Sequence, residues 1–204
     1  MYRIFGKRLL DLLLSLTGLI VSIPIFLIVP LLIKMDSPGT VFFRQKRMGR
    51  GGRFFYLIKF RSMGSNKQGE DNGFEPGSGL RVTRIGKFLR KTKLDEIPQL
   101  LNVFIGDMSF VGPRPEVERY KDFYAGKFAG VLSVRPGITD RASIKYRHEE
   151  EILAESKDPE KTYREIILPD KLEIALAYAQ RGIRLSEDIN IIVQTLLTVL
   201  KRKK

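Results

Sequence analysis

The stretch LLDLLLSLTGLIVSIPIFLIVPLLI, from Leu9 to Ile33, decides the architecture of this chain. It contains no Lys or Arg, and its one charged side chain is Asp11. An unbroken helix over this stretch would reach about 37 Å, more than the roughly 30 Å of hydrocarbon in a bilayer. We therefore expect it to lie in lipid. We interpret Asp11 as the partner of Lys7 and Arg8 in an ion pair at the headgroup level, not as a catalytic group.

Two features favour a segment that enters and leaves the membrane by the same face. Basic residues flank it on both sides, which the positive-inside rule assigns to the cytoplasm, at Arg3, Lys7, Arg8, Lys34, Arg44, Lys46 and Arg47. Pro24 removes a hydrogen bond near the middle and clashes with the carbonyl of Ile20, while the Ser22 hydroxyl is placed to satisfy a freed backbone group. Taken by itself, the segment fits a kinked helix that crosses the membrane equally well.

The composition limits the chemistry that the chain can perform. Its 204 residues suffice for one ordinary domain with a real core. Lys and Arg number 36 against 23 Asp and Glu, and the net charge of +13 indicates an anionic partner or surface. With no Cys and one His, disulfides, thiolate zinc sites and Cys nucleophiles are excluded. Carboxylates and basic side chains must carry any catalysis, and we interpret His148 as a paired surface residue.

Short patterns predict the soluble part of the fold. The aromatic and β-branched stretches Thr40 to Arg44 and Phe54 to Phe60 are separated by glycines, which predicts a β-hairpin or strand pair. From Thr83 to Val103 apolar residues recur at three- and four-residue steps, which predicts helices with a boundary just before Pro98. The segment from Gly64 to Gly79 is rich in Gly, Ser, Asn and Glu, which predicts a mobile loop.

Two more helices are expected, from Tyr163 to Ala179 and from Ser186 to Leu200. The second has an apolar stripe and ends in the basic residues 201–204, so it is either a core helix with a solvated tail or a helix lying on anionic lipid, which we favour. The predicted class is α+β and mostly helical, with a small β element. Residues 1–36 would form one re-entrant membrane helix broken near Pro24, and residues 37–204 a catalytic domain with interfacial helices, together one functional unit.

Asp95 and Glu96 lie at the expected helix junction. Adjacent carboxylates on a helix point about 100° apart, so one can meet a metal ion while the other faces a phosphorus atom. For the pair alone, an N-cap or surface role for Asp95 is the simpler interpretation. Its surroundings favour phosphate chemistry, because Arg90 precedes it and Arg114, held between two prolines, presents a guanidinium on a stiff loop.

Six short motifs follow the proline-broken apolar segment in a fixed order: QKRMG (45–49), KFRSM (59–63), RVTRIG (81–86), LDEIPQ (94–99), GDMSFVGPRP (106–115) and PGIT (136–139). Their order closely resembles that of the bacterial sugar transferase family, the monotopic phosphoglycosyl transferases. The resemblance covers essentially residues 1–147.

The resemblance implies transfer of a sugar 1-phosphate from a UDP-sugar to a polyprenyl (undecaprenyl) phosphate, giving a polyprenyl diphosphate sugar and UMP. This would be the first membrane step of surface glycan assembly, at the cytoplasmic face of the bacterial inner membrane. It implies a covalent phosphosugar on Asp95 and Mg2+ bound by Glu96. The substrate-binding candidates are Lys59, Arg61, Arg90, Arg114, Arg147 and, in addition, Arg8. Besides both substrates, membrane lipid is an expected partner and nucleic acid is not, while a homodimer is left open.

The sugar cannot be named from the sequence. The family often continues the PGIT motif with Gly-Trp-Ala-Gln, whereas this chain has Asp140-Arg141-Ala142-Ser143. We expect discrimination between sugars in the segment Asp140 to Arg147. The rival function is a non-catalytic, basic, membrane-associated adaptor that binds anionic lipid, which would explain the charge but not the Asp95-Glu96 pair. A polytopic transferase or phosphatase would need several apolar spans, and one is present.

Overall fold

The computed structural model describes residues 2–64, 82–181 and 183–201. The loop predicted from Gly64 to Gly79 lies outside these residues except for Gly64, as does the end of the basic tail, residues 202–204. The helices are α1 (Lys7–Val21), α2 (Ile23–Asp36), α3 (Arg84–Thr92), α4 (Gln99–Ile105), α5 (Arg141–Lys145), α6 (Glu149–Ala154), α7 (Pro159–Thr162), α8 (Leu168–Arg181) and α9 (Leu185–Lys201). The strands are β1 (Phe42–Met48), β2 (Phe54–Phe60), β3 (Ser109–Val111) and β4 (Gly137–Thr139). The described part is mostly helical with two small sheets, which confirms the predicted α+β class.

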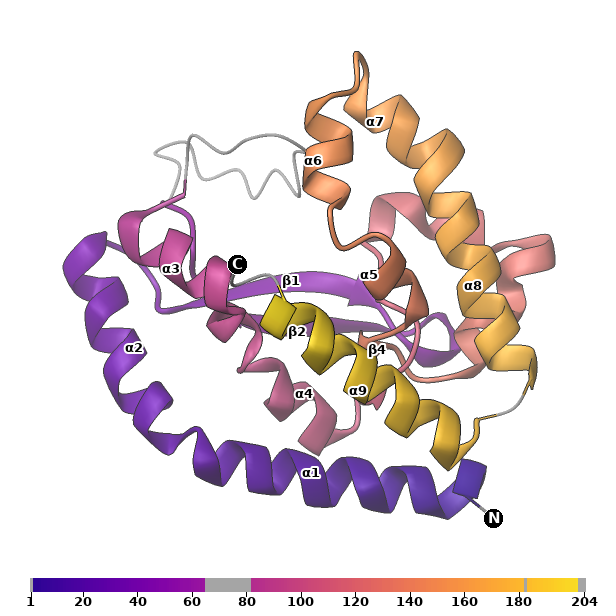
Figure 1. Cartoon of the computed structure of the whole chain (residues 1–204), viewed down its shortest axis with the longest axis horizontal. Helices are drawn as coiled ribbons and strands as arrows, with labels where there is room; N and C mark the ends of the chain where they lie inside the picture. Colours follow the sequence, from indigo (N-terminus) through magenta and orange to yellow (C-terminus); the bar gives the residue numbers. More distant parts are fainter. Residues whose placement is uncertain (1, 65–81, 182, 202–204) are drawn as a thin grey trace.

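A bent arm formed by α1 and α2 runs along one side of the molecule (Figure 1). The two helices meet at Ser22 with a bend of 58°, and Pro24 lies in the first turn of α2. Among the described residues no single helix is long and apolar enough to cross a membrane, and α1 and α2 pass that test only as a bent pair. The break lies where the sequence predicts it. The Ser22 side chain makes no capping hydrogen bond to the start of α2, and its backbone N–H donates to the carbonyls of Gly18 and Ile20 at the end of α1.

The arm and α9 present large apolar side chains to the outside. On α1 and α2 the side chains that are more than half exposed include Leu9, Leu13, Ile20, Val21, Leu27 and Leu31. On α9 the apolar stripe is exposed as well, with Ile189, Val193, Leu196 and Leu197 between 46% and 58% exposed, whereas Ile191, outside the stripe, is fully buried. Most of the stripe therefore faces outward, while Ile192 packs partly buried against the core cluster that contains Ile191. Exposed apolar surface of this extent marks a membrane or protein interface.

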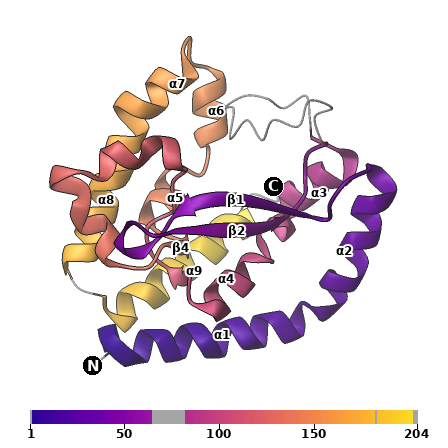
Figure 2. The same ribbon diagram turned by 180° about the vertical axis from the view of Figure 1, so that it is seen from behind.

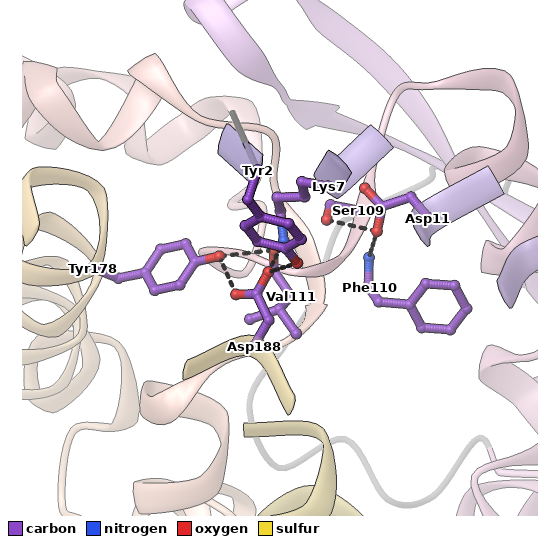
Figure 3. Close-up of polar contacts among 8 residues, drawn as sticks. All are labelled: Tyr2, Lys7, Asp11, Ser109, Phe110, Val111, Tyr178 and Asp188. Atoms are coloured by element: carbon purple, nitrogen blue, oxygen red, sulfur yellow. Dashed lines mark hydrogen bonds and ion pairs between the residues drawn. The ribbon is translucent and has the colours of Figure 1, made fainter. Parts of the chain in front are cut away.

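A buried polar network attaches the start of α1 to the C-terminal helices (Figure 3). Lys7 Nζ donates to Asp188 Oδ2 of α9 over 2.7 Å, and the Tyr2 hydroxyl donates to the same oxygen over 2.7 Å. Tyr178 of α8 donates to Asp188 Oδ1 over 2.8 Å. Asp188 is 1% exposed. Its buried carboxylate is stabilised by the charge of Lys7 and by hydrogen bonds from the two tyrosine hydroxyls.

Asp11 fastens α1 to β3 in the same region (Figure 3). Its Oδ1 accepts hydrogen bonds from Ser109 Oγ and from the Phe110 backbone N–H, both at 3.0 Å, and the residue is 3% exposed. The predicted ion pair with Lys7 and Arg8 at the headgroup level is wrong. Burial against β3 gives Asp11 nearer partners, while Lys7 turns to α9. The bent arm is thus tied directly to the strand that leads into the Arg114 loop.

The predicted hairpin is confirmed, with β1 and β2 antiparallel from Phe42 opposite Phe60 to Met48 opposite Phe54. Helix α4 contacts both β2 and α1 and lies between the hairpin and the arm, as the view from behind shows (Figure 2). A separate apolar cluster packs α8 against the segments Glu118–Tyr124 and Gly126–Ser133. The turn that carries Asp95 and Glu96 lies against α3 and β2.

Candidate active site

The two carboxylates lie on a short turn between α3 and α4. Helix α3 is capped by Thr83, whose Oγ1 accepts from the Gly86 N–H over 3.0 Å. Helix α3 ends at Lys93, which adopts a left-handed backbone conformation with φ of 59° and donates its N–H to carbonyls of the last turn of the helix. One 3-10 turn, Leu94–Glu96, follows, and Pro98 precedes the first turn of α4. The predicted boundary before Pro98 is confirmed.

Asp95 is buried without full hydrogen bonding. It is 7% exposed, and within the described part its Oδ1 has no hydrogen-bond partner. Burial raises the pKa of Asp95; the charges of Lys59, Lys93 and Arg90 oppose that rise, while Glu96 adds to it. The position excludes the N-cap or surface role that is simplest from sequence. A buried carboxylate oxygen without a partner is costly, and such groups concentrate at functional sites.

Glu96 is held between two cations. Its Oε1 accepts from Lys59 Nζ over 2.8 Å and lies 3.6 Å from Arg114 Nη2. Burial alone would raise the pKa of Glu96, but the charges of Lys59 and Arg114 outweigh it and hold this pKa far below its usual range. Glu96 is therefore ionised at neutral pH. The arrangement combines an ionised carboxylate, a buried carboxylate and two donors suited to phosphate oxygens.

Asn102 of α4 hydrogen-bonds to the backbone of β2 just before Lys59 and so helps to hold that strand in place. The Asn102 side chain accepts from the Ile58 N–H over 3.0 Å and donates to the Tyr56 carbonyl over 2.8 Å, as a neighbouring strand would. Asn102 is 1% exposed. Sequence reasoning missed this residue, because a polar residue in a helical pattern gives no sign of its partner on a distant strand.

Arg114 follows a tightly built strand pair. Strands β3 and β4 run parallel. A Cβ on Gly137 would lie 2.2 Å from the backbone N of Gly112, so the two backbones can come this close only with glycine at position 137. Beyond this strand pair, Arg47 Nη1 donates to the Pro115 carbonyl over 2.9 Å and so holds the loop against β1. Sequence reasoning identified the stiff loop but not Arg47 as its support. The motif QKRMG, which contains Arg47, was the available signal.

The other predicted basic residues differ in their placement. Arg90 is near enough for its charge to lower the pKa of Asp95. Arg61 is buried and donates to the carbonyls of Pro38 over 2.8 Å and Ser37 over 2.7 Å, so it fastens the end of the bent arm. Arg147 is exposed, and no contact joins it to the carboxylates in the described part. Substrate binding by Arg61 and Arg147 stays a prediction.

Arg8 lies at the opposite end of α4 from Asp95. Its guanidinium donates to the carbonyls of Val103 over 2.6 Å and Phe104 over 2.8 Å. These carbonyls belong to the last turn of α4, where a cation also interacts favourably with the helix dipole. The contacts give Arg8 a structural role, and substrate binding by this residue stays a prediction.

A metal ion at this site would need ligands from a substrate. Among residues 2–64, 82–181 and 183–201, no group of three or more His, Cys, Asp or Glu side chains is arranged to hold one. His148 pairs with Glu151 at 3.0 Å on the surface, as the sequence predicts. Mg2+ commonly binds through one or two carboxylates together with substrate phosphates. The ionised Glu96 and the unpartnered oxygen of Asp95 fit that mode.

Comparison with known proteins agrees with the motifs. The family model described as bacterial sugar transferase matches residues 2–202. The chain belongs to the bacterial sugar transferase family. Within the family, it is 41% identical over 143 residues to the UDP-N-acetylgalactosamine-undecaprenyl-phosphate N-acetylgalactosaminephosphotransferase of Aeromonas hydrophila, an alignment that covers 69% of this chain and 34% of that protein.

Two further members of the family carry the name UDP-glucose:undecaprenyl-phosphate glucose-1-phosphate transferase. The Caulobacter vibrioides protein is 40% identical over 142 residues, covering 68% of this chain and 53% of the relative. The Xanthomonas campestris protein is 37% identical over 210 residues, covering 99% of this chain and 40% of the relative. The chain thus spans about a third to a half of the length of these relatives.

Proposed function

We propose that the chain is a phosphoglycosyl transferase, which moves a sugar 1-phosphate from a UDP-sugar to a polyprenyl phosphate such as undecaprenyl phosphate. The products are a polyprenyl diphosphate sugar and UMP. The observation that carries the proposal is the buried, unpartnered oxygen of Asp95 beside Glu96 and its two cations, Lys59 and Arg114. The family and the names of its members support it.

In the first step a carboxylate oxygen of Asp95 attacks the phosphorus that bears the sugar. The bond from that phosphorus to the oxygen bridging the two phosphates breaks, and UMP leaves with the electron pair. Lys59 and Arg114 neutralise charge on the phosphate oxygens, and Glu96 holds both cations in position. Mg2+, when bound through Glu96 and the diphosphate, supplies additional charge neutralisation.

In the second step an oxygen of the polyprenyl phosphate attacks the same phosphorus. The bond between phosphorus and Asp95 breaks, and the free carboxylate is restored. A covalent intermediate divides the transfer between two bulky substrates into two steps, so UMP can leave before the lipid phosphate enters. The buried position of Asp95 limits access of water to that intermediate.

The proposal includes a re-entrant arm at the cytoplasmic face of the bacterial inner membrane. Three observations support it: basic residues on both flanks, the 58° bend, and the exposed apolar side chains of the arm. The exposed stripe of α9 supports a helix lying on the same lipid surface. In this arrangement the catalytic domain meets the polyprenyl phosphate at the headgroup plane.

The test is release of UMP from a panel of UDP-sugars by the purified full chain in lipid nanodiscs with Mg2+ and polyprenyl phosphate. We expect UMP and polyprenyl diphosphate sugar in equal amounts with at least one sugar, and loss of both when the metal is chelated. Binding to anionic lipid without turnover of any UDP-sugar would support the adaptor function instead.

A further inference from the structure

The end of the bent arm lies against the helix that leads to the catalytic carboxylates. In both ribbon views the last part of α2 lies beside α3 (Figure 1, Figure 2). Asp36, the last residue of α2, accepts a hydrogen bond through Oδ2 from the Ile85 backbone N–H over 2.9 Å. Ile85 is the second residue of α3, and this N–H is one of the four that a helix leaves without an internal partner at its start. The arm therefore supplies a bond that α3 cannot make within itself.

The start of α3 is also held by the segment that follows β2. The Thr83 N–H donates to the Ser62 carbonyl over 3.2 Å. A Cβ on Gly86 would lie 1.9 Å from the same carbonyl oxygen, so the helix approaches this segment as closely as glycine allows. The position of this end of α3 is thus set by Ser62 and by Asp36 of the arm together.

Apolar packing joins the arm to α3 further along the helix. Val29 and Ile33 of α2 belong to one buried cluster with Leu89 of α3. Leu94, the residue immediately before Asp95, is partly buried and packs against this cluster. The contacts between arm and helix therefore extend from the start of α3 to the neighbour of the proposed nucleophile.

Helix α3 connects the bond at Asp36 to the catalytic turn without an intervening loop. Its nine residues span about 13 Å, and Arg90 lies in its last turn. Lys93 is both the C-cap of α3 and the residue before the turn Leu94–Glu96. A hydrogen-bonded helix shifts as a unit, so a displacement at its start also moves the turn that carries Asp95.

We propose that Asp36 is a positioning residue for the transfer reaction. Its carboxylate holds the start of α3 against the arm, and the helix fixes where Asp95 stands relative to the donor phosphate. Asp36 acts through α3 and not by contact with a substrate. The inference rests on the proposed function and adds to it that the arm sets the geometry of the nucleophile as well as resting on lipid.

The experiment follows the first step alone, because that step needs no lipid substrate. Wild-type and variant chains in nanodiscs with Mg2+ are mixed with a saturating excess of the best donor among UDP-glucose, UDP-galactose and their N-acetylamino counterparts, without polyprenyl phosphate. Rapid quenching then gives the burst of UMP. Its amplitude counts the folded chains, and its rate constant reports the reaction within them. Loss of a merely structural contact lowers the amplitude, whereas loss of a positioning contact lowers the rate constant.

In Asp36→Ala we expect the rate constant of the burst to fall at least about tenfold, since a misplacement of about 1 Å can cost on the order of 10²-fold in rate. Asp36→Asn keeps an oxygen that can accept from the Ile85 N–H, so its rate constant should stay within about threefold of the wild-type value. Asp158→Ala is the matched control, because it removes the same kind of bond at the start of another helix, α7, where Asp158 accepts from the Lys161 N–H over 3.0 Å. It should leave the rate constant unchanged.

Other outcomes overturn the inference. A rate constant in Asp36→Ala within about twofold of wild type, at any amplitude, would leave Asp36 a structural role only. An equal fall in Asp158→Ala would assign the effect to general destabilisation, and an equal fall in Asp36→Asn would assign it to charge instead of the bond to α3. If Asp36→Ala gives no folded chain, Asp36→Ser answers the same question, because its shorter side chain draws the acceptor back from Ile85; its rate constant should fall at least about threefold. Failure of the proposed function has a different signature, since the wild-type chain would then release no UMP from any donor.

Discussion

Replacing Asp95 by Asn should abolish turnover and at the same time stabilise the fold. The amide keeps the shape of the carboxylate but cannot form a phosphosugar ester, so UMP release should fall by on the order of 10⁴ or more, as when nucleophiles are removed from other enzymes. Burial raises the pKa of Asp95, so folding favours its protonated form. A protonated Asp95 therefore stabilises the folded state at low pH, and this contribution is lost as pH rises through the raised pKa. At neutral pH the ionised carboxylate destabilises the folded state relative to a neutral side chain at the same position.

The size of the stabilisation follows from the burial of Asp95, which is 7% exposed with one unpartnered oxygen. The amide removes the buried charge but keeps a buried polar group in its place, so the recovery is limited to about 1–3 kcal/mol. For a chain of this length each kcal/mol corresponds to about 2–4 °C in Tm, so Asp95→Asn should melt roughly 2–12 °C higher at pH 7. The difference should shrink as pH falls, because the wild-type carboxyl then becomes protonated.

Thermal unfolding in nanodiscs at pH 7 and pH 5, together with UMP release, checks both parts. Asp122→Asn is the matched control, because Asp122 is exposed and its change should stay within about 0.5 kcal/mol. Loss of activity with a lower Tm would show that Asp95 supports the fold. Activity near the wild-type level would refute its assignment as nucleophile.

Three further predictions concern the ion pair, the anchoring network and the arm. Glu96→Gln leaves the largely buried Lys59 without its carboxylate partner and should cost about 1–3 kcal/mol in thermal unfolding at pH 7. This cost should shrink as pH falls toward the lowered pKa of Glu96, and the exposed control Glu118→Gln should cost under about 1 kcal/mol. Asp188→Asn breaks a buried ion pair and should cost about 3–5 kcal/mol and make α9 sensitive to protease, whereas unchanged protection would contradict its anchoring role. Pro24→Ala should straighten the arm, so that a single Cys placed near the N-terminus becomes reactive from outside the cell; outside reactivity in the wild-type background would refute the re-entrant topology.

Local patterns in the sequence were enough to predict the elements that frame the site. The aromatic and β-branched residues from Phe54 to Phe60 predicted a strand, and Pro24 and Pro98 predicted breaks that the structure contains. These features depend on neighbouring residues, whose effects on backbone conformation are short-range. The position of the carboxylate pair at a helix junction was predictable for the same reason.

The contacts that assemble the site were not predictable from local patterns. The sequence predicted that Asp11 pairs with residues three and four positions away, yet its hydrogen-bond partners lie on β3, almost a hundred residues along the chain. Asn102 and Arg47 likewise act on segments distant in sequence. A single sequence shows which residues are polar but not which of them become buried together, because burial is decided by tertiary packing.

The central claim of this account is that Asp95 becomes covalently linked to the sugar phosphate. The most direct measurement is intact-mass and peptide-mapping mass spectrometry of the chain mixed with its preferred UDP-sugar and Mg2+, without a lipid acceptor, and quenched in acid. We predict a mass gain of one sugar phosphate on the peptide containing Asp95, with one UMP released per chain, disappearance of the adduct when polyprenyl phosphate is added, and no adduct in Asp95→Asn. An adduct on another residue, or UMP release that requires the lipid and leaves no adduct, would contradict the claim.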